Sequence, residues 1–227
     1  VQTCALPISH TDIFLAAALG LTDRAVALLQ EHPALLDEKT GHGRYAELPP
    51  SSFHMYFWTI GSNRSPLEVA AQFGHTDTLA AMLAFATPVQ QLRLACRRTD
   101  TDAARALVRE HPDLVASLSA QDHRAITDAA WDGDARAVEL MLELGFDPST
   151  PGHDSGTALH CASWQGSAET VAVLLSAPQG RALLTVRDAH HQDMPIGWCR
   201  HGAVHGPRGG DFVAVEKLLL TPDRSSV

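Results

Sequence analysis

The stretch Gly156-Thr-Ala-Leu-His-Cys-Ala-Ser-Trp-Gln-Gly166-Ser-Ala-Glu-Thr-Val-Ala-Val-Leu-Leu175 predicts two short helices separated by a glycine. Thr157 is suited to begin the first helix, because its hydroxyl can accept a hydrogen bond from a backbone N–H of the first turn. Gly166 is suited to end it, since glycine adopts the left-handed conformation without steric cost. The second half has the three and four spacing of an apolar helix face, at Val171, Leu174 and Leu175. Two helices this short bury little surface alone, so the stretch predicts a repeat that needs neighbours.

Equivalent stretches recur along the chain. When they are aligned on the residue between the two helices, six candidate repeats result, with that residue at Gly20, Gly74, Thr99, Gly133, Gly166 and Gly210. Gly133 and Gly166 are 33 residues apart, and Thr99 lies 34 residues before Gly133. Six stretches with a common pattern predict a repeat architecture over nearly the whole chain.

The repeats resemble those of the ankyrin family. Thr157-Ala-Leu-His-Cys-Ala162 is similar to the T-P-L-H-x-A opening of an ankyrin repeat, with Ala158 in place of proline, and Gly145-Phe-Asp-Pro148 is similar to its G-A-D-P turn. The resemblance implies an all-α fold, an ankyrin-repeat solenoid of about six helix-turn-helix repeats with β-turn tips and two insertions. It also implies that His160 hydrogen-bonds turn backbone between repeats.

The expected domain organisation follows from this alignment. Residues 1–10 do not fit the pattern and resemble a translated sequencing-adaptor remnant, which favours a bacterial source from environmental reads; we expect a non-native or disordered tail there. Residues 221–227 are expected to be a second tail. A single repeat domain is expected over residues 11–220, with repeats at about 11–36, 65–86, 90–116, 123–148, 154–185 and 191–220.

Two insertions interrupt the period. The shorter one is expected as a glycine-rich loop at residues 202–210, between the two helices of the last repeat. The longer one, residues 37–64, combines glycine and proline with the aromatic cluster Phe53-His-Met-Tyr-Phe-Trp58. Such a cluster predicts either a lid folded onto the neighbouring repeats or a partner-binding element. An extended segment alternates its side chains, so we expect a mixture of the two, with Phe53, Met55 and Phe57 inward and Tyr56 and Trp58 outward.

Composition limits the class of partner and the cellular location. The formal net charge is −9 and the pI is about 5.7, which argues against nucleic acid and anionic membranes as partners. The four cysteines form no C-x-x-C pair and are expected to be reduced. No apolar run reaches the length of a membrane span, and no signal peptide is visible at the start. We expect a cytoplasmic monomer.

A metal site is the first chemical hypothesis that the sequence raises. The densest group of ligand types in the chain is His190, His191, Asp193, Cys199, His201 and His205. Zinc takes cysteine and histidine ligands, but these spacings match no common zinc pattern. We therefore expect surface histidines and neither metal nor cofactor, and a metal-dependent module remains a third functional alternative.

Catalytic hypotheses receive less support. His160 and Cys161 are adjacent, and neighbouring helical side chains point about 100° apart, so they are not expected to form a thiol–imidazole pair. The chain also lacks the common phosphate-binding, serine-hydrolase and zinc-protease motifs. We expect that the protein is not an enzyme.

Trp131 and Trp164 occupy equivalent positions, two residues before the glycine that separates the helices. Paired aromatic residues at a concave surface favour partner binding, while packing between repeats is an equal alternative. Trp198 is placed nearer the core and is interpreted as structural. The predicted partner-binding residues are Tyr56, Trp58, Gln72, Phe73, Arg97, Arg98, Trp131, Asp132, Trp164 and Gln165.

These residues predict a non-catalytic protein–protein interaction scaffold. It would bind an unidentified protein through the concave ankyrin groove and the insertion at residues 40–62. The alternative is a regulatory or targeting fragment of a larger protein whose catalytic domain lies outside this chain.

Overall fold

The computed structural model describes residues 11–45, 59–61 and 63–221. Helices joined by turns make up these residues, and no strand occurs among them, so the expected all-α class is confirmed. The chain divides into two compact units, an N-terminal unit (Val1–Leu94) and a C-terminal unit (Ala95–Val227). The division falls within helix α6 (Pro88–Arg97).

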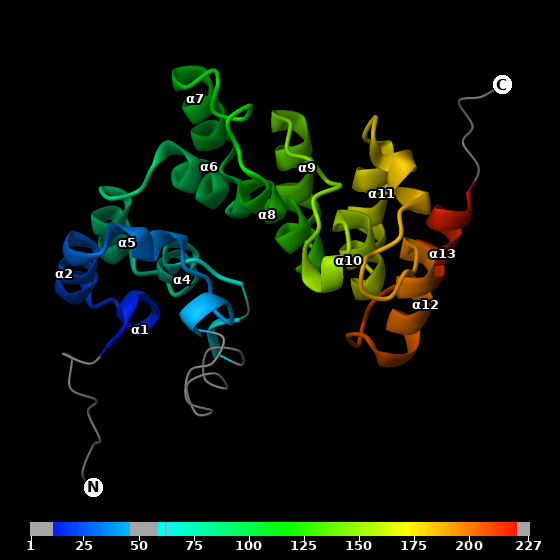
Figure 1. Cartoon of the computed structure of the whole chain (residues 1–227), viewed down its shortest axis with the longest axis horizontal. Coiled ribbons are helices and arrows are strands. Elements are labelled where there is room, and N and C mark those ends of the chain that lie inside the picture. Colours follow the sequence, from blue (N-terminus) through cyan, green and yellow to red (C-terminus); the bar gives the residue numbers. More distant parts are fainter. Residues whose placement is uncertain (1–10, 46–58, 62, 222–227) are drawn as a thin grey trace, which may run out of the picture. The chain divides into compact units, whose positions relative to one another are not determined.

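The N-terminal unit contains two helix pairs, α1 (Ile13–Ala18) with α2 (Thr22–Glu31) and α4 (Pro66–Gln72) with α5 (Thr76–Leu83). The first helices α1 and α4 pack on each other, as do the second helices α2 and α5 (Figure 1). After α2, the short 3-10 helix η2 (Pro33–Asp37) turns its leucines into the core. The side chains that fill this core include Phe14, Leu29, Leu35, Leu36, Leu67 and Met82.

The C-terminal unit repeats this arrangement over more helices. Three first helices lie side by side: α8 (Ala120–Trp131), α10 (Ala158–Gln165) and α12 (Pro195–His205) (Figure 1). The second helices are α9 (Ala135–Leu144), α11 (Ala168–Ser176) and α13 (Phe212–Leu220), and α11 contacts both of the others. The unit also contains α7 (Thr101–Glu110) and the 3-10 helices η5 (His153–Ser155) and η6 (Gly180–Thr185).

The backbone repeats at the positions on which the sequence was aligned. In five of the six helix pairs, the residue between the helices has a positive φ, from 53° to 75°: Gly20, Gly74, Thr99, Gly133 and Gly166. In the last pair the left-handed residue is Gly209 and not Gly210. The residue immediately before the second helix has φ of −81° to −92° and ψ of 73° to 88° in all six pairs: Leu21, His75, Asp100, Asp134, Ser167 and Asp211.

Replacing Thr99 with glycine is expected to stabilise the protein by about 1 kcal/mol. Thr99 is β-branched and has a φ of 53°, a conformation that costs a residue with a Cβ roughly 1–2 kcal/mol and glycine almost nothing. Urea unfolding measures the change. Thr101→Gly is the matched control, because Thr101 lies in the first turn of α7, where glycine should destabilise by up to about 1 kcal/mol. Equal effects of the two changes would contradict the assignment of Thr99.

The two ends of the longer insertion are fixed to the N-terminal unit. Thr40 Oγ1 donates a hydrogen bond to the Gly61 carbonyl (2.7 Å) and accepts one from Arg64 N (2.9 Å), so one side chain closes the loop. Tyr45 and Ile60 are both buried, and Tyr45 packs edge-on against Phe14. The predictions for Phe53, Met55, Tyr56, Phe57 and Trp58 lie outside the described residues.

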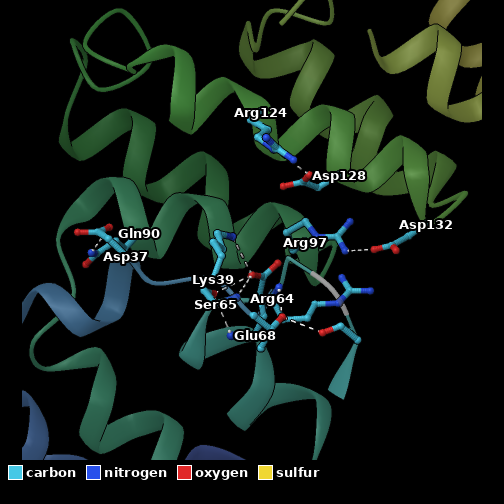
Figure 2. Close-up of polar contacts among 12 residues, drawn as sticks. Asp37, Lys39, Arg64, Ser65, Glu68, Gln90, Arg97, Arg124, Asp128 and Asp132 are labelled. Atoms are coloured by element: carbon cyan, nitrogen blue, oxygen red, sulfur yellow. Dashed lines mark hydrogen bonds and ion pairs between the residues drawn. The ribbon is translucent and has the colours of Figure 1, made fainter. Parts of the chain in front are cut away.

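Buried polar contacts join the start of this insertion to α4. Lys39 Nζ lies 3.2 Å from Glu68 Oε2, and the same carboxylate oxygen accepts hydrogen bonds from the backbone N–H and hydroxyl of Ser65 (Figure 2). Ser65 Oγ in turn accepts a hydrogen bond from Glu68 N (3.3 Å) and so caps α4, as the Ser-Pro sequence predicts. Gln90 Nε2, from α6, donates a hydrogen bond to Asp37 Oδ1 at the end of η2 (2.6 Å; Figure 2).

The prediction of a loop over residues 202–210 is wrong in its first part. Helix α12 continues through His205, so residues 202–205 are helical and only 206–211 connect α12 to α13. Glycine serves close packing here, because a Cβ added at Gly202 would lie 2.6 Å from the Trp164 carbonyl oxygen. A Cβ added at Gly210 would lie 2.5 Å from the Gln165 carbonyl oxygen, so the same explanation applies there.

Candidate functional site

A pocket of about 390 Å³ lies in the C-terminal unit. Its walls come from α8, η5, α10, α12 and the turn before α12, and three of the lining side chains are tryptophans. The lining residues are Trp131, Asp154, Trp164, His191, Asp193, Gly197, Trp198 and His201.

The three tryptophans occupy the successive first helices of the unit. Trp131 and Trp164 have nearly parallel rings, with centroids 6.5 Å apart and an interplanar angle of 6°. Trp198 meets Trp164 edge-on, at 6.4 Å and 78°. Trp131 and Trp164 are half-buried, whereas Trp198 is buried. These two rings therefore pack against each other between successive first helices and also line the pocket.

Histidines extend this aromatic wall. The His153 ring stacks on Trp131 with centroids 4.2 Å apart, and the His201 ring stacks on Trp164 at 5.4 Å. His191 lies 6.3 Å from the Trp198 ring. His190 and His191 are exposed at the turn before α12, as expected from the sequence.

Asp188 holds Trp198 and this turn in place. Its buried carboxylate accepts hydrogen bonds from Trp198 Nε1 (3.0 Å), His191 N and Asp193 N (3.1 Å). Burial by itself would raise the pKa of Asp188, but these hydrogen bonds outweigh it and lower the pKa below the ordinary value. Asp188 is therefore a charged residue that fixes one wall of the pocket.

Glycines leave the room that the pocket needs. A Cβ added at Gly156 would lie 2.8 Å from the Trp198 ring. A Cβ added at Gly197 would lie within 2.2 Å of the Asp193 carboxyl carbon, closer than any real contact. The positions of Trp198 and Asp193 thus require glycine at both places.

His160 joins two repeats from a buried position beneath the pocket. Its Nδ1 accepts a hydrogen bond from Thr157 N (3.1 Å), and its Nε2 lies 3.1 Å from the Asp193 carbonyl oxygen, to which it donates. His160 thus hydrogen-bonds the backbone of the turn before α12, as expected from the sequence. Burial lowers the pKa of His160 below its ordinary value, even though the Asp193 backbone hydrogen bond and nearby carboxylates act in the opposite direction.

The buried His160 should make folding stability depend on pH. Because the pKa of His160 is lower in the folded state than the ordinary 6.5, the unfolded chain binds this proton first as the pH falls. The contribution is therefore fully present above about pH 6.5 and is lost as the pH falls from there through the folded pKa. Urea unfolding between about pH 7.5 and pH 5.5 should show a smaller loss for His160→Gln than for wild type. Identical losses would contradict this role.

The thiol next to His160 is unsuited to catalysis. Cys161 is fully buried, and burial raises its pKa far above the ordinary value. Burial likewise raises the pKa of Cys96 to about 12, and that of Cys199 rises as well. A protonated thiol is a poor nucleophile, so these cysteines act as small apolar residues.

Two carboxylates complete the pocket. Asp154 has an exposed side chain and a φ of 45°, and Ser155 after it has a φ of 60°. The Ser155 hydroxyl holds this turn by accepting hydrogen bonds from Ala189 N (2.8 Å) and His190 N (3.0 Å). Asp193 Oδ1 accepts a hydrogen bond from Met194 N (2.8 Å) at the start of α12.

The other predicted binding residues that the structure describes do not line the pocket. Gln72, Phe73 and Arg98 are exposed, and Gln165 is half-buried. Arg97 forms an ion pair with Asp132 (Figure 2). Tyr56 and Trp58 lie outside the described residues. From the predicted set, the pocket thus brings together Trp131 and Trp164.

The sequence analysis does not predict Asp154 as a pocket residue or Asp188 as the acceptor that holds Trp198. It places His191 and His201 at the surface, and it names them with Asp193 as candidate metal ligands. Within residues 11–45, 59–61 and 63–221, no three His, Cys, Asp or Glu side chains are grouped closely enough to hold a metal ion. Of the histidines in that group, His201 stacks on Trp164 and His191 meets the Trp198 ring edge-on. The one indication in the sequence was the repeated tryptophan two residues before Gly133 and Gly166.

No helix in the described part of the chain is both long and apolar enough to span a membrane. A comparison with protein-family models and with curated proteins found no match to this chain. The tryptophan pocket is therefore the feature from which a function can be inferred.

Proposed function

We propose that the protein is a non-catalytic scaffold of the ankyrin-repeat type that binds a segment of a partner protein. The observation that carries the proposal is the pocket lined by Trp131, Trp164 and Trp198, on three consecutive first helices. In the ankyrin architecture this helix face and the turn tips form the concave groove. The insertion at residues 40–62 is a second candidate contact region in the same proposal.

Three local features support the ankyrin assignment. A left-handed residue, followed by a residue with φ near −80° and ψ of 73° to 88°, recurs at each of the first five helix pairs. Thr157 and His160 make the hydrogen bonds expected of the Thr-x-Leu-His opening. Within the C-terminal unit, first helices pack on first helices and second helices on second helices, which is how stacked repeats bury a continuous core.

Tryptophan is the residue type on which protein interfaces depend most, because one side chain buries a large, rigid surface. Trp131 and Trp164 are only half-buried, whereas the third lining tryptophan, Trp198, is buried and held by its hydrogen bond to Asp188. The pocket volume lies in the range of sites that hold a ligand or an inserted side chain. The buried, protonated thiols offer no nucleophile, which favours binding over catalysis.

Selection from a random-peptide display library on the full chain tests the proposal. Peptides that bind wild type should bind Trp164→Ala at least about 10-fold more weakly, because truncating a central aromatic anchor removes most of its contact. Fluorescence polarisation with a labelled peptide measures the affinities. Circular dichroism confirms that each variant is folded at the temperature used.

Val213→Ala is the matched control, since Val213 is a strongly exposed apolar side chain on α13 that does not line the pocket. It should bind the selected peptides as wild type does. The proposal is wrong if every selected peptide binds Trp164→Ala and Trp131→Ala with wild-type affinity while both variants remain folded.

A further inference from the structure

We propose that the tryptophan pocket binds a positively charged side chain of the partner segment, the guanidinium of an arginine. This inference rests on the proposed function and specifies the chemistry that the pocket recognises. Two properties of the pocket point to it, the charge of its polar groups and the aromatic surface beside them.

The ionised groups that line the pocket are acidic. Asp154 and Asp193 contribute carboxylates, and the lining residues include neither lysine nor arginine. Asp188 adds a third carboxylate, which accepts the Trp198 indole N–H outside the pocket lining, and its lowered pKa keeps it ionised. The pocket therefore has an unbalanced negative charge near three indole rings.

The arginines near the pocket have partners within this chain. Arg187 Nη1, from the turn before α12, donates a hydrogen bond to the Gln192 carbonyl oxygen (2.6 Å), and three other arginines pair with carboxylates. Arg124 Nε lies 3.5 Å from Asp128 Oδ1, Arg97 pairs with Asp132, and Arg200 Nε lies 2.8 Å from Glu216 Oε1. His190 faces Asp154 from the exposed side, with 3.7 Å between its Nδ1 and Oδ1. A cation supplied by a partner would thus meet Asp193 and Asp154 without displacing an arginine of this chain.

Aromatic surface beside carboxylates matches a guanidinium in particular. The negative face of an indole ring attracts cations, and tryptophan does so most strongly. A guanidinium is planar, stacks on aromatic rings and donates several hydrogen bonds to carboxylates at once. Trp131, Trp164 and Trp198 provide the rings, and Asp154 and Asp193 provide the acceptors.

The probe is N-acetyl-arginine methylamide, with its citrulline counterpart as a neutral control of the same shape. The full chain is labelled with ¹⁵N at its four tryptophans, and the indole N–H peaks are assigned with single Trp→Phe variants. Titration with the arginine compound should shift the Trp131 and Trp164 peaks in a saturable manner. The citrulline compound should produce less than about a third of the shift at equal concentration, because it lacks the charge.

Asp154→Asn tests the contribution of the carboxylate without disturbing the turn, since asparagine tolerates the left-handed conformation of this residue well. It should weaken binding of the arginine compound about threefold at low salt, and raising the salt concentration should weaken wild-type binding as well. Asp113→Asn, at an exposed aspartate outside the pocket, should leave binding unchanged.

Equal shifts with the arginine and citrulline compounds, or no shift of the Trp131 and Trp164 peaks with either, would overturn the inference. These outcomes are distinct from failure of the proposed function. If selected peptides lacked arginine but their binding still depended on Trp164, the proposed peptide-binding function would hold and only the inference of an arginine in the pocket would be rejected.

Discussion

Replacing Asp188 with alanine is expected to lower the free energy of unfolding by about 3 kcal/mol. The carboxylate accepts hydrogen bonds from two backbone N–H groups of the turn before α12 and from the Trp198 indole N–H. Without it, the indole N–H is left buried with no acceptor, and a donor in that state costs roughly 1–3 kcal/mol by itself. Because Trp198 is a wall of the pocket, the change should also weaken binding of the selected peptides. Urea unfolding and fluorescence polarisation measure the two effects.

Asp134→Ala is the matched control. Asp134 also accepts a backbone hydrogen bond, from Ala137 N, but it does so alone at the start of α9. Loss of such a cap costs about 1 kcal/mol. If Asp188→Ala were no more destabilising than Asp134→Ala, the three-donor arrangement around Asp188 would not organise the turn.

Replacing Leu159 with alanine is expected to cost about 2–5 kcal/mol. Leu159 is fully buried in α10, which packs on both α8 and α12. The truncation leaves a cavity between helices that neighbouring repeats hold in position, so the site cannot close around it easily. Adjacent repeats are coupled, so the loss should extend to them and appear as a lower midpoint for the whole C-terminal unit.

Leu220→Ala removes the same atoms from an exposed position at the end of α13. It should change the free energy of unfolding by no more than about 0.5 kcal/mol. A Leu159→Ala protein that unfolded at the same denaturant concentration as wild type would contradict the placement of α10 in the core.

The helix pairs could be predicted because the properties that define them are local. Gly166 and Thr99 mark the chain reversal between two helices by their own conformation. Ser65 with Glu68 caps α4 within three residues. Pro33 ends α2 and brings Leu35 and Leu36 into the core. Each of these properties is determined by a few consecutive residues and does not depend on contacts with neighbouring helix pairs.

The pocket could be predicted only in part, because it depends on contacts between repeats. Asp188 acts through Trp198, ten residues later, and its burial is set by the packing of α12 on α10. His201 lies in the last repeat but stacks on Trp164 in the one before it. The sequence predicts Gly202 in a loop, whereas it lies within helix α12. A glycine is needed there because the Trp164 carbonyl lies against it. The spacing of residues along the chain does not show which side chains of different helix pairs contact each other.

A crystal structure of the protein with a selected peptide would test the central claim most directly. The account predicts that a side chain of the peptide lies in the pocket, in contact with Trp131 and Trp164, with its charged end at Asp154 or Asp193. A peptide bound on the second helices α9, α11 and α13, with the tryptophan pocket left empty, would contradict it.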